Sequence, residues 1–123
     1  EMAYATAAAL MQAKKLSQAR SYCQKAMSFK ENYGEPYILL AQLYGSNPNW
    51  TDEPALNKCT YFVVIDKLQR AKAVDPSVTE RANVFISTYS RHTPQAKDLF
   101  MLGYKAGDRI TIVGWIGEST TIR

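Results

Sequence analysis

The segment GEPYILLAQLYGSNPNW, from Gly34 to Trp50, contains a helical stretch that is apolar on almost every side. From Tyr37 to Tyr44 only Gln42 is clearly polar. A surface helix of a globular protein normally exposes a broad polar face. Because burying one large apolar side chain contributes roughly 1.5–3 kcal/mol, this stretch requires packing partners on at least two sides.

Helical segments precede this stretch. Alanine, the strongest helix former, dominates residues 2–14 and predicts a first helix there. A second helix is expected over residues 17–29, with Ser17 as its N-cap. Gly34 then ends that unit, and Pro36 suits the first turn of the apolar third helix.

Two further helices are expected after the apolar stretch. One covers residues 54–74, begins after Thr51 or Asp52 as its N-cap, and ends at the sequence DPS. Proline ends it because a helical conformation is disfavoured at the residue before proline. The other covers residues 78–90, since the preceding motif SVTE has the spacing of a capping box.

The chain changes character over residues 93–123. A short helix is expected here, with Thr93 as its cap, Pro94 at its first position and Gly103 just beyond its end. In the following DRITIVGWI, polar and apolar side chains alternate, and the turn residues GES and the β-branched TTIR come next. This pattern predicts a C-terminal β-hairpin.

A fixed interval along the chain relates the first helix to the third. The third helix carries a large residue, a leucine, a small residue and a tyrosine, in the order Tyr37-x2-Leu40-Ala41-x2-Tyr44. Ala7 precedes Ala41 by 34 residues, and Leu10 precedes Tyr44 by the same 34 residues. The second and fourth helices each carry a stripe at matching spacing, formed by Ala19, Cys23 and Ala26 in one and by Val64, Leu68 and Ala71 in the other. A period of this length indicates stacked helix pairs.

This spacing resembles the tetratricopeptide repeat (TPR), whose first helix reads W-x2-L-G-x2-Y. The resemblance implies a mainly α-helical superhelix over residues 1–92, built from two antiparallel helix pairs and a capping helix, with an insertion near residues 45–55. Residues 93–123 then form a second part, made of the short helix and a hairpin cap. Pro76 stands at the repeat's terminal proline position, whereas Glu31 replaces proline in the first repeat. Trp50 is interpreted as a lid over the core, with a partner anchor as the alternative.

The stretches AKAVDPS, LFMLGYKAGD and VGWIGESTTIR resemble the C-terminal part of TPR proteins from Bacteroidetes-type bacteria. That resemblance implies export to the periplasm or cell envelope. The chain opens directly on a helical pattern, so we expect it to be a segment of a longer protein. It has no run of 18 or more apolar residues, and no membrane-spanning helix is expected.

In TPR proteins the first helices of the pairs line a concave groove that holds an extended peptide or a partner's helix. The resemblance carries this role to ten positions: Tyr4, Ala8, Met11, Gln12, Glu35, Ile38, Gln42, Asn83, Ser87 and Arg91. The arc near Ile38 and Gln42 is expected to be free. The family's basic and asparagine clamp for a C-terminal carboxylate is absent, because its positions hold Tyr4, Ala8, Gln42, Asn83 and Ser87.

The expected hairpin has two interpretations. Its apolar residues, Ile110, Ile112, Trp115 and Ile122, can close the open end of a helical stack. Alternatively, its edge strand can pair with another chain and lead to self-association. We favour the cap.

Catalytic and metal-binding patterns do not stand out. The net charge of +4 comes from 15 basic and 11 acidic residues scattered along the chain. Cys23 and Cys59 have neither metal-ligand spacing nor a disulfide framework. His92, the only histidine, stands at a predicted helix end. We predict no catalytic residue, no metal and no cofactor.

The sequence therefore predicts a non-enzymatic protein–protein interaction or scaffold module that binds a protein or peptide partner, not nucleic acid. A nucleic-acid-binding helical repeat is the alternative, and it would require one face formed by Lys14, Lys15, Arg20, Lys67, Arg70 and Lys72. A catalytic or accessory enzyme domain would require a pocket that joins Cys59, His92 and a carboxylate.

Overall fold

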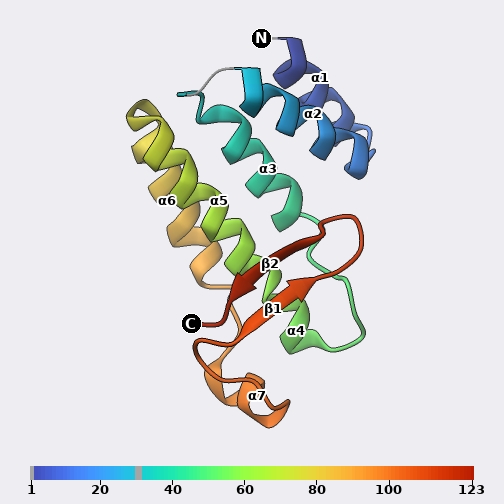
Figure 1. The fold of residues 1–123 in the computed structure, drawn as a ribbon, viewed down its shortest axis with the longest axis vertical. Helices are drawn as coiled ribbons and strands as arrows, with labels where there is room; N and C mark the ends of the chain where they lie inside the picture. Colours follow the sequence, from blue (N-terminus) through green and yellow to red (C-terminus); the bar gives the residue numbers. More distant parts are fainter. Residues whose placement is uncertain (1, 30–31) are drawn as a thin grey trace.

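The computed structural model of the chain describes residues 2–29 and 32–123. The fold is mainly helical and ends in a two-stranded antiparallel sheet, as the sequence predicts (Figure 1). Glu31, the predicted departure from the repeat, lies outside the described residues. The elements are α1 (Met2–Gln12), α2 (Leu16–Phe29), α3 (Glu35–Gly45), α4 (Pro54–Lys58), α5 (Thr60–Val74), the 3-10 turn η1 (Pro76–Val78), α6 (Thr79–Ser90), α7 (Ala96–Met101), β1 (Arg109–Ile112) and β2 (Glu118–Thr121).

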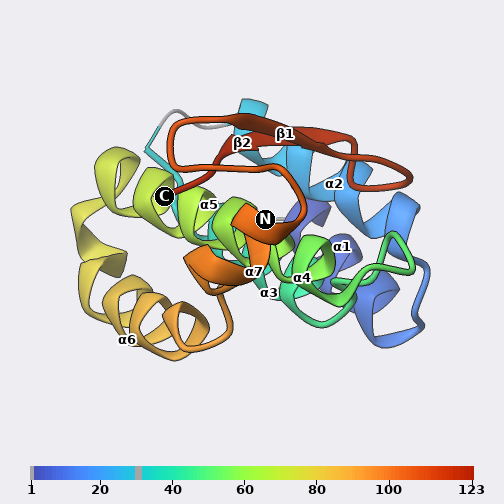
Figure 2. The same ribbon diagram turned by 90° about the horizontal axis from the view of Figure 1, so that it is seen from below.

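The five longest helices alternate in direction along the molecule (Figure 1). Contacts join α1 to α2, α2 to α3, α3 to α5 and α5 to α6. Seen along the helices, α1, α3 and α6 form one row and α2 and α5 form a second row (Figure 2). The β-hairpin lies across the outer side of the second row, so the first row keeps an uncovered face.

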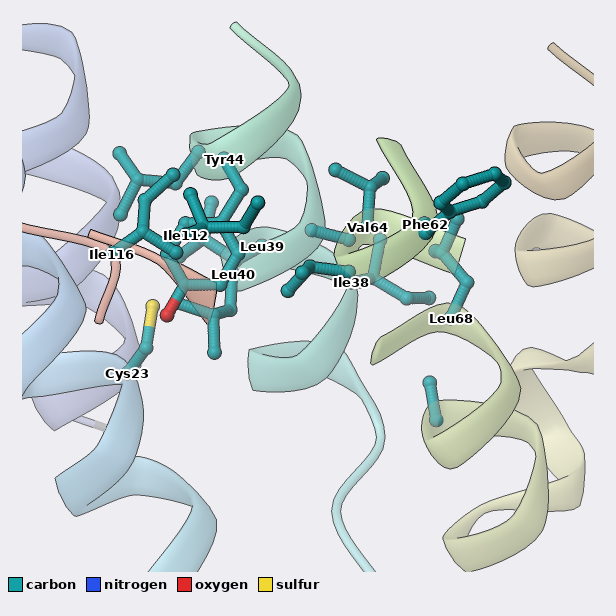
Figure 3. Close-up of a cluster of buried hydrophobic side chains, with 14 of the residues drawn as sticks. Cys23, Ile38, Leu39, Leu40, Tyr44, Phe62, Val64, Leu68, Ile112 and Ile116 are labelled. Atoms are coloured by element: carbon teal, nitrogen blue, oxygen red, sulfur yellow. The ribbon is translucent and has the colours of Figure 1, made fainter. Parts of the chain in front are cut away.

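Helix α3 is enclosed by its neighbours, which explains its nearly continuous apolar character. Its buried side chains pack in one cluster with residues of α2, α5 and the hairpin (Figure 3). Gln42 remains half-buried. The expectation that Ile38 is free is wrong: its side chain is only 1% exposed, because α5 packs along that side of α3.

The predicted fourth helix is interrupted. The chain bends at Cys59, where tight i to i+3 hydrogen bonds connect α4 to α5. Glu53, and not Thr51 or Asp52, is the N-cap of α4. The bend places the hydroxyl of buried Thr60 where it donates to the Pro48 carbonyl oxygen at 2.8 Å, so the insertion is tied to the start of α5.

Gly34 has a different role from the predicted helix stop. It is the N-cap of α3 and has φ −83°, so no left-handed conformation requires glycine. The requirement is space, because a Cβ atom here would lie 2.8 Å from Asp75 Cβ and 2.8 Å from Val78 Cγ2. The Gly34 amide also donates to Asp75 Oδ2 at 3.0 Å. The loop before α3 is thus held against the turn between α5 and α6.

Three other predicted caps differ from the structure. Ser17 is the second residue of α2 and not its N-cap. In place of the SVTE capping box, Asp75 Oδ1 accepts from the amide and the hydroxyl of Ser77, at 3.1 and 2.6 Å. Gln95, and not Thr93, is the N-cap of α7, which leaves Pro94 outside that helix. Gly103 does lie just beyond the end of α7, with φ +92°.

We expect Gly34→Ala to destabilise the fold. The added methyl group must push α3 away from the α5–α6 turn, and overpacking of this kind typically costs about 1–3 kcal/mol. Chemical denaturation followed by circular dichroism measures this loss. Asn32→Ala, at an exposed position of the same loop, is the matched control and should change the free energy of unfolding by under about 0.5 kcal/mol. Equal stabilities for the two variants would contradict the close packing described.

Candidate functional site

The uncovered face of the first row is hollowed into a groove of about 720 Å³. Ala8, Met11 and Gln12 of α1 line it together with Gln42 of α3, so four of the ten predicted groove residues come together. Leu39, Asn47 and Tyr89 also contribute to the lining. We call this feature the α1–α3–α6 groove. Its lining mixes apolar side chains with side-chain amides, the Ser46 hydroxyl and, among the described residues, one cation, Lys14.

Tyr89 of α6 forms a wall of the groove that the sequence did not reveal. Its ring lies directly on Gly45, where a Cβ atom would be only 2.7 Å from the ring. On α5, Tyr61 stacks on Tyr89 with a centroid separation of 5.9 Å. Burial, and then the neighbouring Tyr61, raise the pKa of Tyr89. The glycine at the end of α3 therefore lets α6 approach and close this side of the groove.

The other predicted groove residues are distributed over different sites. Near the start of α3, Glu35 Oε1 accepts from Arg81 Nη1 at 2.5 Å, and burial followed by the Glu35 charge raises the pKa of Tyr4. Asn83 and Ser87 are exposed on α6, and Arg91 lines a second pocket described below. Ile38, being buried, presents no surface to a partner. Arg81 was missed because its ion pair joins residues far apart in the sequence.

A chain of polar contacts fastens the hairpin to the second row. The buried Tyr44 hydroxyl donates to Glu118 Oε2 at 2.6 Å and accepts from Arg20 Nε at 2.7 Å. Glu118 Oε1 also pairs with Lys67 Nζ at 2.6 Å. Burial and the bond to Glu118 raise the pKa of Tyr44. One hydroxyl thus connects α2, α3 and β2, and the Glu118 carboxylate extends the connection to α5.

A second set of contacts holds the end of the hairpin. Asp66 Oδ2 on α5 accepts from the Thr120 hydroxyl at 2.7 Å, and Arg123 forms an ion pair with Asp66. The Arg123 guanidinium also lies 5.0 Å from the centre of the Phe62 ring. The apolar residues expected in the cap, Ile110, Ile112 and Ile122, are buried, and Trp115 packs against Tyr44 at 5.4 Å. The hairpin therefore covers a side of the stack, and not the open end that the sequence had suggested.

The insertion after α3 is ordered by one amide. Asn57 Oδ1 accepts from the amides of Trp50 and Thr51, at 2.9 and 3.0 Å, while Asn57 Nδ2 donates to the Thr51 carbonyl oxygen. Trp50 Nε1 donates to the Leu56 carbonyl oxygen at 3.1 Å. The half-buried indole packs against the core, which confirms the interpretation of Trp50 as a lid.

The groups capable of nucleophilic or metal chemistry are separated. Cys23 and Cys59 are free, fully buried thiols, and burial raises their pKa values to about 12 and about 11. His92 lines a pocket to which Cys59 does not contribute. Across residues 2–29 and 32–123, no group of three or more His, Cys, Asp or Glu side chains is placed to hold a metal ion. Within the same residues, no helix is long and apolar enough to cross a membrane.

Comparison with known proteins gives no relative: no family model, no curated protein and no solved structure matches the chain. The relationship to TPR proteins therefore stays a prediction from the sequence. The function has to be argued from the groove, the pockets and the charges of the molecule itself.

We expect Tyr44→Phe to destabilise the protein by about 1–2 kcal/mol, because it removes a buried hydroxyl that makes two hydrogen bonds. Thermal and urea unfolding would show this as a lower midpoint. Tyr22→Phe on α2 is the control, since Tyr22 is only half-buried and its ring would still face Lys25. A Tyr44→Phe protein as stable as this control would mean that the polar chain does not hold the hairpin.

The two thiols generate a prediction about alkaline pH. Their pKa values are raised in the folded state above the ordinary value of 9.0, so the folded protein favours the neutral thiol. This contribution to stability is complete below pH 9 and is lost as the pH rises through the folded pKa values. Urea unfolding should therefore show stability decreasing between pH 9 and pH 11. The Cys23→Ala, Cys59→Ala double variant should lose part of this pH dependence, and an unchanged slope would contradict the assignment.

Proposed function

We propose that this chain is a TPR-like, non-enzymatic interaction module whose α1–α3–α6 groove binds an extended peptide or a segment of a partner protein. The burial of equivalent positions supports the repeat. Ala7 of α1 and Ala41 of α3, which stand one period apart in the sequence, are both fully buried. The two stripes of the second row, Ala19, Cys23 and Ala26 on α2 and Val64, Leu68 and Ala71 on α5, are also fully buried.

The observation that carries the proposal is the groove itself. Its volume of about 720 Å³ lies within the range of roughly 300–1,000 Å³ that is usual for ligand pockets. Gln12 and Gln42 supply amides that both donate and accept hydrogen bonds, as the backbone of an extended peptide requires. The Asn47 side chain offers its amide oxygen, because its amide nitrogen already donates to the Leu43 carbonyl oxygen and the Ser46 hydroxyl. Met11 and Leu39 supply an apolar, adaptable floor for side chains.

The two alternatives have less support. For the nucleic-acid hypothesis, Arg20 and Lys67 are already engaged with Tyr44 and Glu118, so they do not extend a free basic face. For the enzyme hypothesis, Cys59 is buried with a raised pKa and donates to the Ala55 carbonyl oxygen at 3.7 Å. A nucleophilic thiol instead requires a lowered pKa and access to substrate.

Selection of peptides from a random display library against the full chain tests the groove. The Met11→Glu, Gln42→Ala double variant places a charge on the floor and removes one amide. We expect it to bind the selected peptides at least ten-fold more weakly, because apolar contacts and amide hydrogen bonds are lost. Fluorescence anisotropy with labelled peptides measures this change.

Val84→Glu on α6 is the matched control, because Val84 is 65% exposed and does not line the groove. It should bind the peptides as the unmodified chain does. Selected peptides that bind the double variant and the control equally well would rule out this groove as the binding surface. A library that yields no binding peptide would also count against the proposal.

A further inference from the structure

A second pocket, of about 470 Å³, lies between the insertion, the α4–α5 bend and the end of α6. Pro48, Asn49 and Pro54 form its rim on the insertion side. The remainder of the lining is Asn57, Lys58, Tyr61, Arg91 and His92. We call it the basic pocket. Arg91, which the sequence placed in the groove, belongs here because it is the C-cap of α6 and lies beyond the ring of Tyr89.

The charged side chains that line the basic pocket are all cationic. Lys58 and Arg91 are charged at neutral pH, and in the described part of the chain neither an Asp nor a Glu lines the pocket. Glu53 and Asp98 line an adjoining hollow, which shares Pro54 and Lys58 with the basic pocket. Side chains of one sign that converge on a concave site create a local potential that attracts the opposite charge.

Lys58 and Arg91 differ from the cations that form ion pairs within the fold. Lys67, Arg81 and Arg123 are each joined to a carboxylate. Among the described residues, by contrast, Lys58 and Arg91 have no ion-pair partner within 4.0 Å. The Arg91 charge is therefore available to a ligand, and the Lys58 charge, which borders the hollow of Glu53 and Asp98, is not bound to either carboxylate.

The end of α6 does not compete strongly for these cations. The negative end of a helix dipole resides on the last carbonyl groups. In α6, several of these carbonyl oxygens already accept a hydrogen bond from the chain itself. The Ser90 carbonyl oxygen accepts from the Thr93 hydroxyl at 2.9 Å, and the Thr88 carbonyl oxygen accepts from the Arg91 amide at 3.4 Å. The Tyr89 carbonyl oxygen accepts from the His92 amide at 2.9 Å.

The basic pocket adjoins the α1–α3–α6 groove through shared elements. The His92 ring lies 5.2 Å from Tyr61, and Tyr61 stacks on Tyr89, which lines the groove. The loop after α3 also borders both sites, with Asn47 in the groove and Asn49 in the pocket. A ligand that follows this loop passes from the groove to the two cations of the basic pocket.

We propose that the basic pocket binds a phosphate or carboxylate group, held by Lys58 and Arg91, with His92 donating a ring N–H. A guanidinium and an ammonium provide charge-assisted hydrogen bonds for such an anion. The group comes either from a free small anion or from an acidic part of the segment bound in the groove. Only the second source rests on the proposed function.

Phenyl phosphate and inorganic phosphate are the probes for the first source. Because His92 is the only histidine, its ring signals in an NMR titration of the full chain report on the pocket directly. At constant pH and ionic strength we expect a saturable shift with either phosphate and none with chloride. The Lys58→Gln, Arg91→Gln variant should raise the midpoint at least ten-fold.

The matched control is Arg70→Gln, Lys72→Gln, which removes the same charge from α5 outside the pocket. Its titration should equal that of the unmodified chain. An equal weakening in both double variants would show that net charge alone attracts the anion, and this would overturn the site.

Pairs of peptides that differ only in negative charge test whether the anion belongs to the segment bound in the groove. A peptide selected on the groove would be compared with versions in which each Glu is Gln or the C-terminus is amidated. If removal of the negative charge weakens binding to the unmodified chain but not to the Lys58→Gln, Arg91→Gln variant, the anion belongs to the partner. The site is overturned if neither the phosphates nor the acidic peptides give a response that depends on these two residues. The Met11→Glu, Gln42→Ala variant separates the two proposals, since it should lose peptide binding and retain the phosphate shift.

Discussion

The enclosure of α3 is the constraint on which the rest of the structure depends. A helix without a polar face is stable only if other elements cover every side of it, because exposed apolar surface costs free energy. Helices α1 and α2 cover one side, α5 covers another, and the hairpin covers a third with Ile112 and Ile116. Only the arc near half-buried Gln42 opens onto the groove. The single hydroxyl in this buried surface, that of Tyr44, is satisfied by Arg20 and Glu118. Apolar burial thus brings α1, α2, α5 and the hairpin onto α3, and one polar chain joins α2, α3, α5 and β2.

The hairpin also decides which surface remains available. It lies on the row formed by α2 and α5 and leaves the row of α1, α3 and α6 uncovered (Figure 2). The groove and the basic pocket therefore both open on surfaces that the hairpin does not reach. The stacked rings of Tyr61 and Tyr89 separate them, which places an amide-lined groove with a single cation among its described residues, Lys14, next to the basic pocket.

The sequence was most informative about burial and least informative about caps. The apolar stripes at Ala19, Cys23 and Ala26 are buried as their spacing predicts. The predicted caps Ser17 and Thr93 are wrong because α2 already begins at Leu16 and α7 begins after Gln95. The position of a cap depends on how the turn before the helix packs. Asp75 shows the reason clearly: its carboxylate caps η1 and simultaneously binds the amide of Gly34, which is distant in the sequence.

What the sequence alone determined was the succession of helices, the C-terminal hairpin and the burial of α3, because these follow from periodicities over a few neighbouring residues. Tertiary structure alone decided that Ile38 is buried, that Gly34 must be glycine for lack of space, and that the hairpin covers a side of the stack. It also brought Lys58 and Arg91, which belong to different helices distant in the sequence, to one pocket. Such juxtapositions depend on how whole elements pack against one another, and helical periodicity carries no information about distances across the fold.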